Sequence, residues 1–250
     1  AFFLLTYLAA DYENPTALEY QRVFLYASIP VAIGLFVIVF FVREPERPPP
    51  VADAVPFKFS IKNFDGNFKK FLVIVALFTL SNSTDAFLLL RAEQAGIAPA
   101  MLPLLWMALH FSKVFSSLIG GELSDKVGRK KMIVSGWVVY AAVYLGFAFV
   151  DSAWQAWALF ILYGTYFGLT EGAEKAMVAD MVDPEKRGTA YGLFNLAFGI
   201  AVFPASLMFG AIWAWFGAEA AFIFSAAISI VAAVLLFTVK LEQAHAETRP

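Results

Sequence analysis

The stretch Gly121-Glu122-Leu123-Ser124-Asp125-Lys126-Val127-Gly128-Arg129-Lys130 decides how the rest of the chain is interpreted. It is a charged segment with glycine at its start and near its end, and long apolar runs lie on both sides of it. Each run is long enough to cross a bilayer as a helix, for which about 20 apolar residues are needed. We therefore expect residues 121–130 to form a tight loop between two membrane helices.

The composition of the whole chain is typical of a membrane protein. Of 250 residues, 60% are hydrophobic and 15% are charged, and the mean hydropathy is +0.71, whereas soluble domains carry about 25% charged residues. The net charge of −2 gives no indication of a nucleic-acid partner. The absence of cysteine excludes disulfides, thiolate metal sites and a cysteine nucleophile. Two histidines, one of them in the C-terminal tail, make a histidine metal site improbable, and no cofactor is expected.

Seven long apolar runs predict seven complete membrane helices. The runs are continuous rather than alternating, which favours helices over a closed barrel. Buried core helices of a large soluble protein are the alternative, but they fit poorly with so little charge. The runs cover residues 22–42, 70–90, 100–120, 132–150, 153–173, 189–213 and 217–239. Residues 1–10 are expected to be the outer half of one more helix, so that the chain has the character of a fragment.

Lysine and arginine alternate between successive loops and so predict an orientation. Fifteen of the 18 basic residues fall in residues 43–70, 126–131, 174–188 and 240–250. The positive-inside rule places these segments, and with them the C-terminus, in the cytoplasm. We expect a multi-pass protein of a bacterial inner membrane.

The proline-rich segment 43–69 is expected to be a cytoplasmic linker. Within it, residues 57–68 alternate aromatic and basic side chains, which fits a short helix on the inner leaflet as well as it fits a solvated linker. The linker divides the chain into residues 1–42 and residues 70–240. The second part should form one bundle of six helices, followed by a cytoplasmic tail at residues 241–250.

Residues 121–130 resemble the signature of the major facilitator superfamily, which lies between the second and third helices of a six-helix bundle. That signature is roughly G-x-L-[AS]-D-[RK]-x-G-R-[RK], and the matching residues are Gly121, Leu123, Ser124, Asp125, Lys126, Gly128, Arg129 and Lys130. The resemblance implies an all-α integral membrane fold of twelve helices in two halves. It makes residues 1–10 the end of helix 5, residues 22–42 helix 6, and residues 70–240 helices 7 to 12 of the C-terminal bundle. The N-terminal half of the same protein would be its partner.

The resemblance also implies that this turn latches the bundle in one conformational state. The residues assigned to the latch are Gly121, Leu123, Asp125, Gly128, Arg129, Lys130, Glu174 and Asp180. Gly121 is expected to permit close helix approach and Gly128 to adopt a left-handed turn. Asp125 can accept hydrogen bonds at a helix start, and Arg129 can bind a carboxylate, for which Glu174 and Asp180 are the expected partners. A turn that only fixes the topology is the alternative.

Residues 171–192 resemble the junction between helices 10 and 11 of bacterial transporters, where Pro184 ends one helix before the next begins. Gly164, Gly168 and Gly172, spaced four residues apart, should permit close approach of a neighbouring helix, with or without a role in gating. Pro204, together with two glycines before it, suggests that the helix of residues 189–213 bends.

Polar side chains at membrane depth are candidate substrate or proton sites, because they are costly to keep there. These candidates are Asn82, Asp85, His110, Lys113, Glu171 and Asn195. Asn82 and Asp85, with Ser81, should form one stripe on the helix of residues 70–90 and face a cavity. Asp85 then binds a cation or a proton, unless it is solvated at the outer rim or pairs with Arg91.

Lys113 needs a partner if it is buried, and Glu171 lies at a comparable depth. His110 is equally compatible with a functional role and with a simple hydrogen bond. Further lining groups are expected from Tyr163, Thr165, Tyr166 and Trp106. The remaining tryptophans are expected to be interface anchors, with those at the outer helix ends fitting best. These are Trp137, Trp154, Trp157, Trp213 and Trp215.

The favoured function is secondary active transport of a small molecule by alternating access, coupled to protons through Asp85 or through Glu171 with Lys113. Export of drugs or metabolites is one version. A receptor or scaffold on the same fold is an alternative. A membrane enzyme is another, but the sequence contains no H-E-x-x-H, G-x-S-x-G or Gly-rich phosphate loop. The substrate is not indicated, because one such scaffold serves many cargoes.

Overall fold

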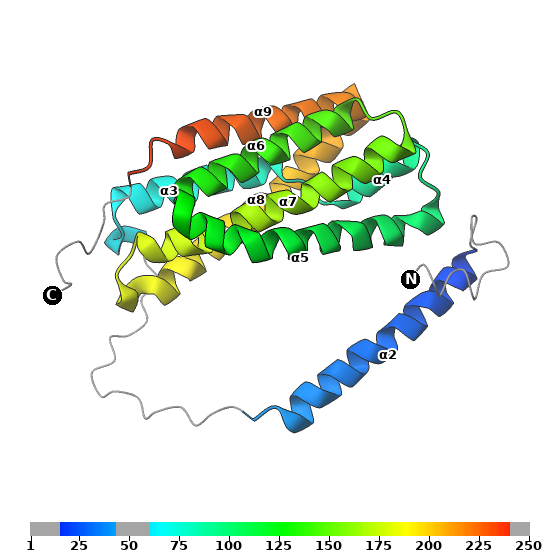
Figure 1. Ribbon diagram of the computed structural model, residues 1–250, viewed down its shortest axis with the longest axis horizontal. Helices are drawn as coiled ribbons and strands as arrows, with labels where there is room; N and C mark the ends of the chain where they lie inside the picture. The colour runs from blue at the N-terminus through cyan, green and yellow to red at the C-terminus, as the bar shows by residue number, and fades with distance from the viewer. Residues whose placement is uncertain (1–15, 44–60, 241–250) are drawn as a thin grey trace. The chain divides into compact units, whose positions relative to one another are not determined.

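The computed structural model describes residues 16–43 and 61–240, and every element within these ranges is helical (Figure 1). The chain separates into two compact units. One contains α2 (Ala17–Phe41) with residues 98–104, and the other contains residues 61–97 and 105–240. The expectations for residues 1–10, 44–60 and 241–250 lie outside the described residues.

Helix α2 begins five residues earlier than predicted because Thr16 caps it. The Thr16 hydroxyl accepts a hydrogen bond from the Glu19 backbone N–H at 3.4 Å, and the Glu19 carboxylate accepts one from the Thr16 N–H at 2.7 Å. This reciprocal capping box satisfies two backbone donors at the helix start. Nearly all side chains of α2 are exposed within the structure, which is typical of a helix that faces lipid or another part of a protein.

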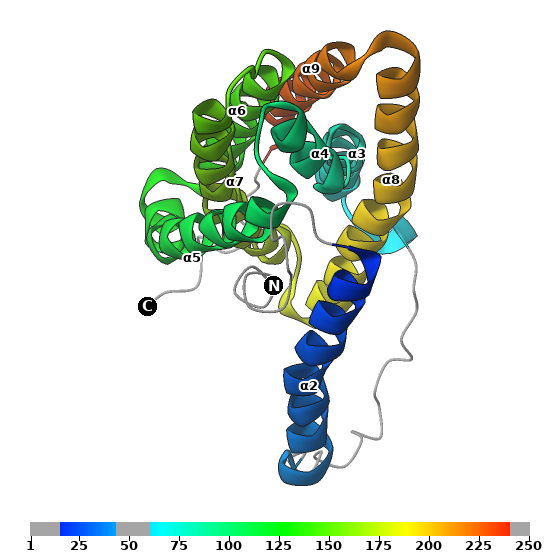
Figure 2. The ribbon, with the colours of Figure 1, turned by 90° about the vertical axis from the view of Figure 1, so that its right-hand side faces the viewer.

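The second unit is a helical bundle. Its elements are α3 (Gly66–Ser81), α4 (Ala86–Gln94), residues 105–127 of α5 (Leu102–Val127), α6 (Arg129–Ala148), α7 (Ala153–Asp180), α8 (Arg187–Phe216) and α9 (Ala218–Leu236), with 3-10 turns at Ile61–Asn63 and Pro184–Lys186. A further 3-10 turn, Pro99–Met101, belongs to the first unit. Helix α6 packs between α7 and α9, and α3 packs between α9 and α8 (Figure 2). The seven predicted runs thus correspond to helices, one of which is divided.

Aromatic side chains fill the centre of this bundle. Trp137 stacks on Phe78 with ring centroids 4.3 Å apart, and Tyr140 stacks on Tyr144 at 4.1 Å. Phe222 of α9 meets the edge of Tyr144 at 5.4 Å. Stacked and edge-to-face pairs of this kind add about 0.5–1.5 kcal/mol each beyond the area they bury. Trp137 is fully buried, so its predicted role as an interface anchor is wrong.

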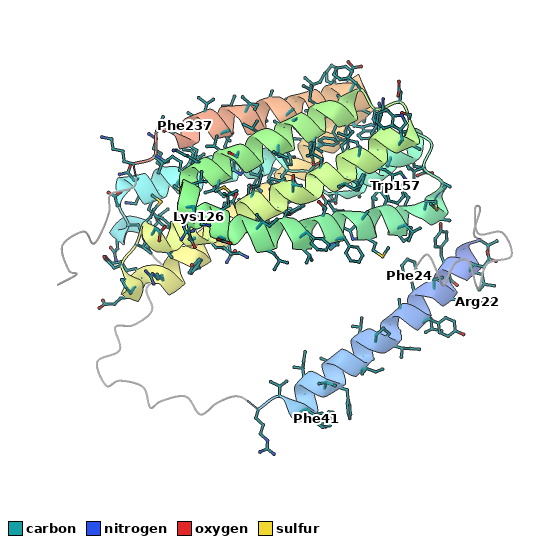
Figure 3. The ribbon with its side chains drawn as sticks, in the orientation of Figure 1. Arg22, Phe24, Phe41, Lys126, Trp157 and Phe237 are labelled. Atoms are coloured by element: carbon teal, nitrogen blue, oxygen red, sulfur yellow. The ribbon has the colours of Figure 1, made fainter. Side chains whose placement is uncertain are left out.

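The two ends of the bundle differ in chemistry. We call the end that carries Lys70, Lys126, Arg129 and Lys130 the basic end. Figure 3 shows Lys126 and Phe237 at this end and Trp157 at the opposite one. Three hydrogen bonds tie residues 238–240, which follow α9, to α3 and α6 there. Lys130 donates to the Val239 carbonyl, Lys70 donates to the Thr238 carbonyl at 3.3 Å, and the Lys240 N–H donates to Asn67 at 3.3 Å.

Six helices in the described residues are long and apolar enough to cross a membrane: α2, α5, α6, α8, α9 and the α3–α4 pair taken together. Helix α7 is as long but does not meet the same hydropathy requirement, because tyrosine, glycine and threonine interrupt its apolar residues. A polar composition suits a helix that lies against other helices and a cavity instead of lipid.

Two expectations about local structure are wrong. Residues 121–127 are not a loop, because α5 continues through them to Val127 and only Gly128 separates it from α6. The run 70–90 is not one helix, because α3 ends at Ser81 and α4 begins at Ala86. The turn between α5 and α6 is therefore the single residue Gly128. The break between α3 and α4 contains two of the candidate transport residues, Asn82 and Asp85.

Candidate functional site

A cavity of about 260 Å³ lies in the bundle, bounded by the α3–α4 break, α5, α7 and α8. Four of the six predicted transport residues line it: Asn82, Lys113, Glu171 and Asn195. Aromatic side chains make up much of the remaining wall, namely Tyr166, Phe167, Phe194 and Phe198. We call this space the polar cavity. A pocket with aromatic walls and a few convergent charged groups is the usual form of a small-molecule site.

Glu171 forms the centre of the charges in the polar cavity. Its carboxylate oxygens lie 3.0 Å from Lys113 Nζ and 3.2 Å from Lys175 Nζ. The expected pairing of Lys113 with Glu171 is therefore present and joins α5 to α7. The Lys113 ammonium group also lies over the ring of Phe167, 4.3 Å from its centroid, in a favourable cation–π position. The two lysines and one glutamate leave a local excess of one positive charge.

The break between α3 and α4 directs two predicted residues toward α7. Asn82 Nδ2 donates to Tyr166 Oη at 3.5 Å, and Tyr163 Oη donates to Asp85 Oδ1 at 2.9 Å. The expected continuous stripe is wrong, since Asn82 and Asp85 lie in the break itself and Ser81 turns back to the Phe78 carbonyl. Sequence spacing missed this, because it assumes an unbroken helix.

Neighbouring helices supply partners for the backbone groups that the break releases. Tyr140 Oη donates to the Ser81 carbonyl at 2.7 Å, and the Thr84 N–H donates to Ser206 Oγ at 3.2 Å. A non-helical segment at membrane depth is tolerated only when protein groups satisfy its backbone in this way. Arg91 does not pair with Asp85, because its guanidinium group donates to the carbonyls of Phe147, Ala148 and Val150.

The other candidates are less closely involved in the polar cavity. His110 is exposed, and its Nδ1 lies 2.9 Å from the Trp106 carbonyl one turn earlier. Neither His110 nor Trp106 lines the cavity. Thr165 donates to the Leu162 carbonyl of its own helix at 2.7 Å and also lies outside the cavity lining.

The signature turn is built around Arg129. Its guanidinium group contacts Asp125 one turn earlier, donates to Ser124 Oγ at 3.1 Å, and reaches Asp180 at the end of α7 at 3.4 Å. Gly128 has a φ of +100°, which a residue with a side chain rarely adopts. The expected partnership of Arg129 with Asp180 and the special backbone of Gly128 are both present.

Two expectations for the signature are wrong. The space around Gly121 is open, whereas a side chain on Gly120 would overlap the backbone of Gly168 on α7. Glu174 does not approach Arg129. Its Oε1 instead accepts a hydrogen bond from Trp137 Nε1 at 3.0 Å, and the side chain lines the polar cavity. Glu174 lies nearly two turns before Asp180, too far along α7 to reach the basic end.

Glycines on α7 allow α5 to approach closely. A Cβ atom on Gly164 or Gly168 would overlap Ser112 or Ser116, respectively, and the serine hydroxyls donate to the carbonyls of Ile161 and Gly164 at 2.6 and 3.1 Å. Gly172 has open space around it. The predicted glycine contact is thus confirmed at two of three positions, and it brings Lys113 of α5 within reach of α7.

Comparison with known proteins identifies the class. The sequence model of the Major Facilitator Superfamily matches residues 3–170 and, in a second alignment, residues 71–250. The chain belongs to this superfamily. An uncharacterised MFS-type transporter of Methanocaldococcus jannaschii is 34% identical over 229 residues, which cover 87% of this chain and 55% of that protein. The chain therefore spans about half the length of this curated relative.

Two further relatives carry functional names. A Na⁺, Li⁺, K⁺/H⁺ antiporter of Planococcus maritimus is 34% identical over 114 residues, 42% of this chain and 27% of that protein. The multidrug resistance protein MdtH of Salmonella paratyphi B is 27% identical over 104 residues, 42% of this chain and 26% of that protein. The family match and the six described helices long enough to span a bilayer identify a multi-pass integral membrane protein.

Proposed function

We propose that this protein is a secondary active transporter that moves a small molecule by alternating access and couples that movement to protons. The observation that carries the proposal is the polar cavity with the Lys113–Glu171 ion pair in its wall. Such a pair joins two helices while the cavity is empty and becomes available to a charged ligand when the helices separate. The named functions of the relatives, cation/proton antiport and multidrug resistance, support an exchange mechanism.

The signature turn is the proposed latch of one transport state. Arg129 links the α5–α6 hairpin to Asp180 on α7 at the basic end. Because both ion pairs lie at exposed positions, each is weak and can break during a transport cycle. We place the basic end in the cytoplasm, in agreement with the charge distribution of the loops. A bacterial inner membrane and a pairing of residues 70–240 with an N-terminal half belong to the same proposal.

Two carboxylates are candidates for coupling. Asp85 is bound by Tyr163 in the helix break, and Glu171 balances two ammonium groups. Protonation of Glu171 would leave Lys113 and Lys175 without their carboxylate. Protonation or deprotonation of the Glu171 carboxylate would therefore favour a rearrangement of α5 relative to α7.

Transport by the complete protein in liposomes tests the proposal. An inward or outward pH gradient is imposed, and movement of tetraethylammonium, sodium and potassium is measured. Asp85→Asn or Glu171→Gln should abolish gradient-driven movement and leave binding detectable, whereas Glu219→Gln at an exposed position of α9 should have no effect. Gradient-driven movement that is unchanged in both variants contradicts a coupling role for these residues. Movement by the unaltered protein that ignores the pH gradient contradicts proton coupling.

A further inference from the structure

Glu174 is a carboxylate in the polar cavity that forms no salt bridge with any residue that the structure describes, although Lys175 attracts it and Glu171 repels it electrostatically. It is half-buried, and its Oε1 accepts a hydrogen bond from the neutral indole of Trp137 at 3.0 Å. An ionised carboxylate removed from bulk water needs a positive partner or several hydrogen bonds. One indole N–H meets only part of that need.

The charged groups around Glu174 are already engaged with others. On α7, Lys175 pairs with Glu171, and on α5, Lys113 pairs with the same glutamate. The neutral Tyr166 hydroxyl of α7 accepts a hydrogen bond from the Asn82 amide in the α3–α4 break. On α6, Arg129 contacts Asp125 and Asp180 at the basic end.

The remaining helix of the cavity, α8, brings no charge to Glu174. Its Tyr191 hydroxyl donates to the Lys175 carbonyl at 3.1 Å, and Asn195 is neutral. Among the described residues, the charged groups near Glu174 are thus paired with other residues.

We propose that Glu174 is the exchange site of the polar cavity, at which a proton and a monovalent organic cation replace one another. The cavity charges support alternate occupancy. Lys113, Lys175 and Glu171 sum to one positive charge, so ionised Glu174 makes the set neutral. Binding of either a proton or a monovalent cation to Glu174 then brings the total charge of the cavity back to +1. Occupancy by both would add a second uncompensated positive charge to the same cavity, where it is repelled by the first.

The walls of the cavity favour an organic cation over a metal ion. Tyr166, Phe167, Phe194 and Phe198 present aromatic surface beside the carboxylate. Aromatic faces attract alkylammonium groups through cation–π interactions. A small metal ion instead needs several oxygen ligands, and no group of three or more acidic or histidine side chains suited to a metal occurs in the described residues.

Proton release on binding tests this inference, which rests on the proposed function for its role in transport. The complete protein in detergent is titrated with tetraethylammonium chloride in weakly buffered solution that contains a pH indicator. The unaltered protein should release protons as the cation binds, and Glu174→Gln should release none. Glu174→Asp retains a titratable group, so it should still release protons, with the pH of half-maximal release displaced. Glu219→Gln is the matched control and should behave as the unaltered protein.

Several outcomes overturn the inference. Proton release by Glu174→Gln equal to that of the unaltered protein contradicts it. If Glu174→Gln does not fold, an unchanged pH dependence in Glu174→Asp contradicts it instead. Failure of tetraethylammonium to bind the unaltered protein, or proton release on addition of sodium chloride alone, contradicts an organic-cation site.

The two proposals can fail separately. If the protein releases protons on binding the cation but does not carry the cation across the liposome membrane, the proposed transport function is wrong and the exchange site at Glu174 still stands. If proton-coupled transport persists in Glu174→Gln, the proposed transport function still stands, but Glu174 has no part in its mechanism.

Discussion

Lys113 Nζ lies 3.0 Å from Glu171 Oε2, so that one ion pair joins α5 to α7 in the wall of the polar cavity. The two side chains are 34% and 46% exposed, and solvent therefore screens the attraction between them. A double-mutant cycle with alanine at both positions should give a coupling free energy of about 1 kcal/mol or less, measured by thermal unfolding in detergent. The Lys126–Glu122 pair, 69% and 73% exposed, is the control and should show no measurable coupling. Equal coupling in the two pairs would contradict a special role for the cavity pair.

The close contact of α5 with α7 predicts that Gly168→Ala destabilises the bundle. The added methyl group overlaps Ser116, which must move together with its helix. Overpacking of this kind typically costs about 1–3 kcal/mol, so the melting temperature should fall. Gly172→Ala, one turn later in open space, should leave it unchanged or raise it. A similar effect of the two substitutions would show that the contact does not limit stability.

The single-residue turn between α5 and α6 predicts opposite effects of alanine at two glycines of the signature. Gly128 has a φ of +100°, and an alanine there should cost about 1–3 kcal/mol through backbone strain. Gly121 lies within α5 with open space around it, so Gly121→Ala should stabilise the helix by up to about 1 kcal/mol. Thermal unfolding of both variants checks the difference. A stabilising Gly128→Ala would mean that the turn has another conformation.

The helix break predicts a stabilising role for the Tyr140 hydroxyl. Tyr140→Phe leaves the buried Ser81 carbonyl without its donor, and an unsatisfied buried carbonyl costs about 1–3 kcal/mol. Tyr191→Phe also removes a donor from a carbonyl, that of Lys175, but at an exposed position where water replaces it. The unfolding temperature should therefore fall in the first variant only. Equal falls would indicate that both changes act through packing.

The start of α3 predicts an acid-dependent loss of stability. Hydrogen bonds from the backbone N–H groups of Asn67 and Gly66 lower the pKa of the exposed Asp65 carboxyl below its ordinary value of 3.8. A carboxyl with a lowered pKa in the folded state stabilises the fold above its ordinary pKa. That contribution disappears as the pH falls from 3.8 through the lower folded value. Asp65→Asn keeps the cap and should flatten this part of the stability profile, measured by unfolding between neutral pH and pH 3. An unchanged acid profile would rule out this contribution.

The sequence predicted the parts of the site that depend on local chemistry. Lys113 and Glu171 were paired because a buried ammonium group needs a carboxylate at its own depth, and depth follows from helix rise. Gly128 and the Arg129–Asp180 contact followed from the signature at residues 121–130. Glu174 was misplaced because proximity in sequence to Asp180 was taken for proximity in space, whereas the direction of its side chain depends on α7 packing against Trp137.

The sequence by itself determined that this protein consists of membrane helices, where they lie along the chain, and which superfamily it belongs to. The length of each apolar run and the ten-residue signature are local properties of the sequence, so both can be recognised without knowing which helices pack together. Only the tertiary structure decided that residues 82–85 break a helix, that Glu174 faces the polar cavity, and that Gly168 admits α5. These features depend on groups supplied by other helices, such as Tyr140, Trp137 and Ser116, whose positions are fixed only when the bundle packs.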